Sequence, residues 1–121
     1  MKFKMLVVLA ALAATTPVSG HDAKSLHGGR IVLAGNFHVE MVAKGDTIDV
    51  YLIDHNNKQV PVAGHKGLAI LSVGGKSERI TLETADNSKL TGKAAGDLPA
   101  QPKGVVQITL PDGKTAQARF N

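Results

Sequence analysis

The chain has 121 residues, a formal net charge of +4 and five histidines, but no cysteine. Without thiols, it can form no disulfide, no thiolate metal site and no cysteine nucleophile. Aromatic residues make up only 3% of the chain, so the core is expected to be aliphatic. Stacking platforms for nucleotide bases or sugars are not expected, for the same reason.

The first twenty residues have the layout of a secretory signal peptide. Lys2 and Lys4 precede an apolar run over residues 5–14 that is too short to cross a bilayer as a helix. Small residues before position 21 favour cleavage after Gly20, whereas a cut after Ala13 would leave a very short apolar segment. The layout predicts an exported protein.

The exported chain is predicted to have two parts, a flexible histidine-containing leader over 21–29 and a β-domain over 30–121. Removing Lys2 and Lys4 lowers the formal charge from +4 to +2, and no basic block remains. Nucleic acid binding is therefore not expected. No later segment is apolar enough to be embedded in a membrane.

From Arg30 onward, short alternating segments are separated by turn residues at regular spacing, and no window keeps apolar residues at helical spacing. This pattern predicts an all-β fold, a small antiparallel immunoglobulin-like sandwich of about seven strands. The segments, some of them very short, are 30–34, 37–43, 47–54, 59–62, 67–73, 77–83, 89–92, 104–110 and 115–120.

The segment from Phe37 to Met41 alternates most regularly. Successive side chains of a strand point to opposite faces, so Phe37, Val39 and Met41 are expected to enter the core. His38 and Glu40 then stand together on the outer face, with Cβ atoms about 7 Å apart. An imidazole and a carboxylate at this spacing can chelate a divalent metal, but an ordinary solvated strand face has the same pattern.

The other four histidines lie in less regular surroundings. If cleavage follows Gly20, His21 offers its α-amine and imidazole as a chelate for Cu(II), or else it is a frayed terminus. His27 precedes Gly28-Gly29, which allow a sharp bend, although a plain leader residue looks the same. His55 is expected at a hairpin tip, and His65 in a loop beside a lysine.

No arrangement typical of catalysis is present: the chain has neither a nucleophile elbow nor a glycine-rich phosphate loop. We therefore expect a protein that is not an enzyme. Met41 is the single methionine after residue 20, which disfavours a thioether-rich Cu(I) site.

Five motifs together resemble a known group: 27–29 (HGG), 38–42 (HVEMV), 50–55 (VYLIDH), 110–114 (LPDGK) and 118–120 (ARF). The chain is similar to small periplasmic proteins that accompany heavy-metal efflux systems of the RND type in Gram-negative bacteria. It also resembles the related β-domain of metal-efflux adaptor subunits. The resemblance implies a metal-linked role. A weaker similarity is to periplasmic copper carriers with an amino-terminal histidine ligand, whose methionine-rich segment this chain lacks.

The leading hypothesis is a periplasmic protein that binds Cu(II) or Zn(II) and buffers the ion or delivers it to an efflux adaptor. The expected ligands are His27, His38 and Glu40, with His21 and His55 in reserve. The alternative is a protein-interaction module that docks on an efflux adaptor or another envelope protein through an exposed edge strand. A leader folded back across the strand of His38 and Glu40 would favour the metal hypothesis.

Overall fold

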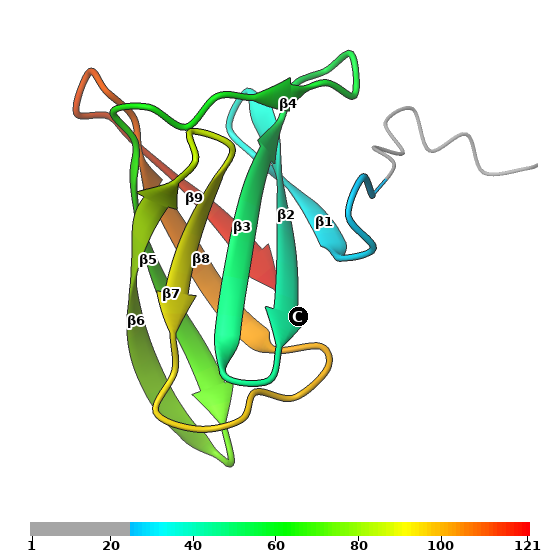
Figure 1. Cartoon of the computed structure of the whole chain (residues 1–121), viewed down its shortest axis with the longest axis vertical. Coiled ribbons are helices and arrows are strands. Elements are labelled where there is room, and N and C mark those ends of the chain that lie inside the picture. The colour runs from blue at the N-terminus through cyan, green and yellow to red at the C-terminus, as the bar shows by residue number, and fades with distance from the viewer. Residues whose placement is uncertain (1–24) are drawn as a thin grey trace, which may run out of the picture.

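The computed structural model describes residues 25–121 as nine antiparallel strands in one sheet that is nearly closed into a barrel (Figure 1). The strands are β1 (Arg30–Ala34), β2 (Phe37–Lys44), β3 (Thr47–Ile53), β4 (Gln59–Val60), β5 (Lys66–Val73), β6 (Lys76–Ala85), β7 (Lys89–Lys93), β8 (Lys103–Thr109) and β9 (Thr115–Phe120). The predicted signal peptide, its cleavage site and His21 lie outside the described residues. Within residues 25–121 no helix has the length and apolarity that a membrane crossing requires.

The sheet follows the order β1-β2-β3-β7-β6-β5-β8-β9, and the short β4 pairs with the end of β3. β1 and β9 lie side by side where the barrel closes. The prediction of an antiparallel all-β fold is confirmed. The structure differs from the expected seven-stranded sandwich, because it has nine strands and one continuous sheet.

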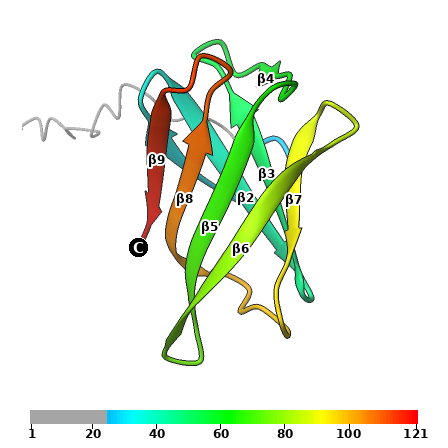
Figure 2. The same cartoon turned by 90° about the vertical axis from the view of Figure 1, so that its left-hand side faces the viewer.

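The continuity of the sheet comes from β6, its longest strand, which runs diagonally across the molecule (Figure 2). The first part of β6, residues 76–82, pairs with β5, whereas residues 83–85 pair with β7. Because β6 pairs with both β5 and β7, it joins into one sheet the strands that would form two separate sheets in a sandwich. β4 is two residues shorter than predicted and stops before Pro61, which has no N–H to donate to a ladder.

The core is aliphatic, as expected, with one large aromatic side chain, Phe120, at 1% exposure. The alternation of β2 is confirmed on this side, because Val39 and Met41 are buried in the core and Phe37 packs against it. The other fully or nearly fully buried residues come from all the longer strands and include Ile48, Val50, Leu52, Leu71, Leu82, Leu90 and Ile108.

One arginine bridges the place where β1 meets β9. The guanidinium of Arg30 donates hydrogen bonds to the carbonyl oxygens of Pro102 (3.2 Å) and Asn121 (2.6 Å). It also lies 5.7 Å from the centre of the Phe120 ring, within the range of a cation–π interaction. Arg30 thus joins the first strand to the end of the last one.

Candidate functional site

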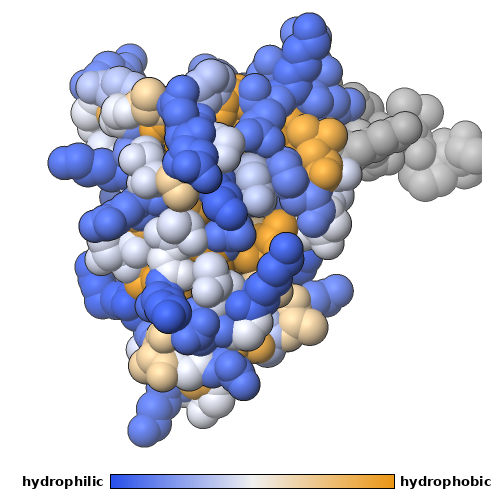
Figure 3. Space-filling model, viewed as in Figure 1, coloured by the Kyte–Doolittle hydropathy of each residue, from blue (hydrophilic) through white to orange (hydrophobic). Residues whose placement is uncertain are grey.

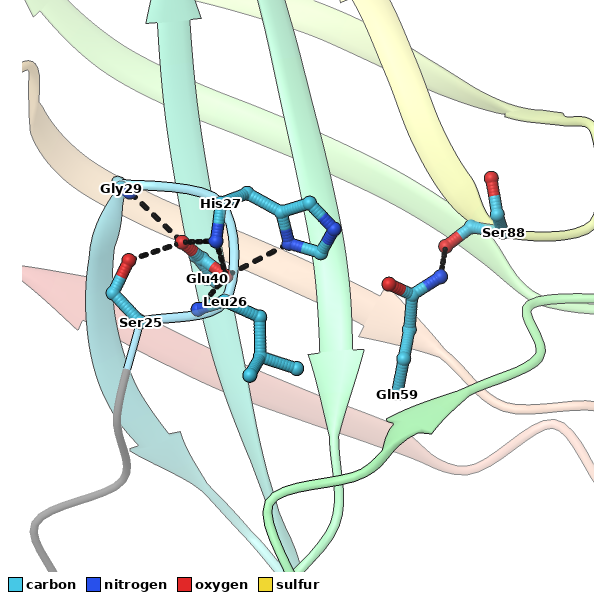
Figure 4. A network of polar contacts seen from close by, with 7 residues as sticks. All are labelled: Ser25, Leu26, His27, Gly29, Glu40, Gln59 and Ser88. Carbon is cyan, nitrogen blue, oxygen red and sulfur yellow. Dashed lines mark hydrogen bonds and ion pairs between the residues drawn. The ribbon is translucent and has the colours of Figure 1, made fainter.

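Strand β2 is buried on both faces. His38 and Glu40 point away from the core, as the alternation predicts, but they are only 6% and 0% exposed. The alternative of an ordinary solvated strand face therefore does not hold for this pair. The segment 25–29 folds back across this outer face and covers Glu40 (Figure 4).

The carboxylate of Glu40 accepts hydrogen bonds from five donor groups of this segment. The Ser25 hydroxyl (2.6 Å) and the backbone N–H groups of Gly29 (2.8 Å) and His27 (2.9 Å) reach Oε2. The N–H of Leu26 (3.1 Å) and His27 Nδ1 (3.0 Å) reach Oε1. Because an ionised carboxylate only accepts hydrogen bonds, Nδ1 carries the imidazole proton.

The electrostatics of Glu40 reflect this enclosure. Burial by itself raises the pKa of the carboxyl, but the hydrogen bonds from Ser25, Gly29 and His27 outweigh it and hold the pKa below its ordinary value. Glu40 is therefore ionised at neutral pH. Its lone pairs are already used, so a metal could reach this carboxylate only by displacing the leader.

Two glycines let the leader approach β2, as the sequence suggested. Gly28 has a φ of +77°, in the left-handed region that favours glycine. A Cβ atom on Gly29 would overlap the carbonyl oxygen of Met41 and lie 2.7 Å from Cγ2 of Val42. The pair therefore supplies both the bend and the close approach.

His27 is held in place on two sides. Its ring stacks on Tyr51 with 3.5 Å between centroids and an interplanar angle of 8°. Tyr51 is the cross-strand neighbour of Glu40 on β3. The His27 ring therefore packs against Tyr51 with its face and is hydrogen-bonded to Glu40 through Nδ1. Sequence reasoning did not single out Tyr51. Its outward position in the alternating segment 47–54 was the available signal.

His38 and His55 form a second pair on the same side. Their ring centroids are 6.1 Å apart and the rings meet at 83°, edge to face. His38 lies opposite Ile53 at the end of β3, and the chain then turns into the loop that carries exposed His55. We call this outer side of β2 and β3 the histidine face.

The remaining histidine of the described residues does not join this group. His65 lies in a loop, as expected, with Nδ1 3.1 Å from the carbonyl oxygen of Ala63. Among residues 25–121, no three His, Asp, Glu or Cys side chains are arranged to hold one metal ion. His21, the other candidate ligand, lies outside the described residues.

A polar cluster that sequence reasoning missed continues the histidine face along β3. The carboxylate of Asp49, which is 8% exposed, accepts hydrogen bonds from Thr91 Oγ1 (2.7 Å) and Lys89 Nζ (3.2 Å). The hydrogen bond and the charge of Asp49 raise the pKa of Lys89. The three side chains satisfy one another across the β3–β7 pairing.

Seen from the side of Figure 3, the surface is mostly hydrophilic, with small hydrophobic areas between the polar residues. Two large hydrophobic side chains of the described residues are exposed, Leu26 at 44% and Leu33 at 57%. Leu33 is the cross-strand neighbour of His38, so it lies on the β1 side of the histidine face.

Comparison with protein-family models, with curated proteins and with solved structures finds no match to this chain.

Proposed function

We propose that the histidine face binds a divalent transition metal, Cu(II) or Zn(II), through the imidazoles of His27, His38 and His55. The folded-back leader supports this proposal, because it brings His27 to the face that carries the other two rings. Imidazole nitrogen suits both metals.

The observation that carries the proposal is the contact between His27 Nδ1 and Glu40, at 3.0 Å. A histidine that binds a metal through one ring nitrogen commonly donates the N–H of the other to a carboxylate, which fixes its tautomer and orientation. His27 already has this arrangement, with Nε2 as the remaining nitrogen. In this proposal Glu40 orients a ligand rather than being one, which revises its expected role.

His38 and His55 need a modest rearrangement to share an ion. Two imidazoles that bind one metal at about 2.0–2.1 Å have coordinating nitrogens at most about 4 Å apart. The centroids of these rings are 6.1 Å apart. His55 lies in an exposed loop, so we expect its ring to turn toward His38 when a metal binds.

His21 is the proposed additional ligand. If cleavage follows Gly20, three residues separate His21 from Ser25, whose hydroxyl is bound to Glu40. A chain rises at most about 3.6 Å per residue, so the four steps from Ser25 to His21 can span up to about 14 Å between their Cα atoms. His38 is two residues from Glu40 along β2, about 7 Å away, and thus falls within this reach.

The cellular role follows from the resemblance of the motifs to metal-efflux proteins. We propose a periplasmic protein without enzymatic activity that buffers the ion or delivers it to an efflux adaptor. Because imidazoles bind metals in their neutral form, metal affinity is expected to fall below about pH 6.

Calorimetric titration with Zn(II) and with Cu(II), followed by NMR, tests the proposal. We expect His27→Ala and a His38→Ala/His55→Ala double variant each to weaken metal binding by at least about tenfold, because the loss of a ligand, or of a residue that orients one, has an effect of this size. His65→Ala is the matched control, since its ring contacts the Ala63 carbonyl and lines a hollow with residues of β5 and β6 rather than of β2 and β3. It should bind as the parent protein does.

Two results would refute this function. One is the absence of metal-dependent shifts at the imidazoles of His27, His38 and His55 at micromolar metal. The other is a loss of affinity in His65→Ala as large as that in the double variant. The first result would mean that these histidines serve the fold rather than a metal. The second would mean that metal binds to scattered histidines rather than to the histidine face.

A further inference from the structure

A second face of the barrel, formed by β6, β5, β8 and β9, is not covered by any described segment. Its outward side chains can be read from the register of these strands. One row crosses the strands at neighbouring positions and has aliphatic residues at its centre and arginines at both ends: Arg79, Ile70, Val105 and Arg119. The central pair is half-buried and both arginines are exposed.

The charge of this side is one-sided. The exposed outward positions of these four strands carry four basic residues and one acidic residue: Lys66, Arg79, Lys103 and Arg119 against Glu83. On β2 and β3, by contrast, the carboxylates of Glu40 and Asp49 are buried and accept hydrogen bonds from nearby residues, so they do not add negative charge to the surface. We call the outward side of β6, β5, β8 and β9 the basic face.

The basic face is hollowed at one end. A hollow of about 390 Å³ is lined by Ile70, Ser72, Ser77, Lys103 and Arg119 together with the backbone around Gly104. Gly104 has a φ of +147°, and a Cβ atom there would overlap the carbonyl oxygen of Ile70. Glycine thus lets β8 approach β5 closely at a hollow that is also lined by two cations and two hydroxyl groups.

We propose that the basic face docks an acidic surface of a partner protein. In this proposal two carboxylates of the partner pair with Arg79 and Arg119. An apolar side chain of the partner, located between its two carboxylates, packs on Ile70 and Val105. Arginine forks bind carboxylates with two parallel hydrogen bonds, and a central apolar contact with a charged rim is the usual anatomy of an interface. Three strand spacings of about 4.8 Å separate the two arginine Cα atoms by about 14 Å, which sets the spacing of the acidic groups.

Charge and shape together favour a protein over the other anionic partners. The exposed large hydrophobic side chains, Leu26 and Leu33, lie elsewhere among the described residues, so the basic face lacks the protruding apolar groups that anchor a membrane-surface protein. Phe120 lines the hollow but is only 1% exposed, so it offers no ring face on which a nucleotide base can stack.

This proposal does not depend on metal binding, because the basic face and the histidine face are formed by different strands. Its test is an NMR titration of the purified protein, expressed from the full-length chain. The probe is a blocked synthetic peptide in which pairs of glutamates flank single leucines. A peptide with lysines in place of the glutamates is its control.

We expect amide shifts to gather at Ser72, Arg79, Gly104 and Arg119, and the lysine peptide to cause none. An Arg79→Gln/Arg119→Gln variant should weaken binding by at least about tenfold, since charge pairs at interfaces contribute on this scale.

The matched control is Lys44→Gln/Lys93→Gln, which removes two exposed cations from the ends of β2 and β7. It lowers the net charge equally, so less than about a twofold change is expected if the site is local. Thermal unfolding of both variants establishes that they are folded.

Three results would overturn the proposal. The first is the absence of peptide-induced shifts on the basic face. The second is an equal loss of affinity in both double variants, which would mean attraction by net charge alone. The third is binding of phosphatidylglycerol vesicles, but not of the peptide, to the basic face, which would assign it to a membrane surface.

Discussion

Glu40 is the residue whose role changes most between sequence and structure. A carboxylate that is fully removed from water is costly unless donors replace its hydration. Here the hydroxyl of Ser25, three backbone N–H groups and the His27 ring do so. Glu40 therefore anchors the leader to β2 and orients a candidate ligand.

The first prediction concerns Glu40→Gln. The amide NH₂ of glutamine cannot accept hydrogen bonds, so it leaves several donors of residues 25–29 unsatisfied in a buried site. We expect the free energy of unfolding in urea to fall by about 2–4 kcal/mol. Glu83→Gln is the control, because Glu83 is exposed on β6, and it should change stability by less than about 0.5 kcal/mol. Equal effects of the two substitutions would contradict the anchoring role.

The second prediction is the pH dependence of the same group. The pKa of Glu40 is lower in the folded protein than in the unfolded chain, so its contribution to stability is present above about pH 4.3 and is lost as pH falls through the folded-state pKa. We expect the stability difference between the parent protein and Glu40→Gln to shrink on acidification. Urea unfolding at a series of pH values measures it. A difference that stays constant down to about pH 3 would disagree with a lowered pKa.

At the scale of elements, the leader and β2 form one unit. β2 uses one set of alternating residues for the core and the other set to bind residues 25–29. The leader lies so close to Met41 and Val42 that residue 29 has no room for a side chain. The leader was expected to be flexible. Its described part, residues 25–29, is held against β2 by hydrogen bonds to Glu40.

The third prediction is that Gly29→Ala loosens this unit. Its methyl group would overlap the backbone of Met41, which cannot move without disturbing β2, so we expect a loss of about 1–3 kcal/mol. Amide exchange at Leu26 and His27 should become faster. Gly96→Ala is the matched control, because no atom lies within 4 Å of an added Cβ there and its φ is not in the left-handed region. Unchanged exchange in Gly29→Ala would show that the leader does not depend on close approach.

At the scale of the whole molecule, stability depends on contacts between distant parts of the chain. β6 turns the sheet between β5 and β7, and Arg30 joins β1 to the chain end beside Phe120. With no cysteine in the chain, the closure rests on packing and hydrogen bonds alone.

The fourth prediction follows from the closure. Phe120 is the largest fully buried side chain, at 1% exposure, and it packs where the barrel closes. Phe120→Ala should lower the free energy of unfolding by about 3–5 kcal/mol, because it leaves a cavity that the aliphatic neighbours cannot fill. Phe37→Ala, at a half-buried position, is the comparison and should cost clearly less. Denaturant unfolding measures both, and the reverse order would argue against a core centred on Phe120.

The sequence alone determined the local structure, because alternation and turn residues act over a few positions. It predicted the antiparallel strands, the inward direction of Val39 and Met41 and the outward direction of His38 and Glu40, all of which the structure has. It also indicated that Gly28-Gly29 permit a bend. These features depend on steric preferences and on the two-residue period of a strand.

Only the tertiary structure decided what covers the outward residues. The donors to Glu40 lie 11 to 15 positions away, and Arg30 reaches a carbonyl 91 positions away. The closure through β6 and the stack of His27 on Tyr51 likewise depend on how strands are ordered in space. An alternating pattern states which face a side chain takes, but not whether water or another segment lies over it. For this reason the sequence left open whether His38 and Glu40 are solvated, whereas in the structure Glu40 is a buried anchor and His38 a shielded imidazole.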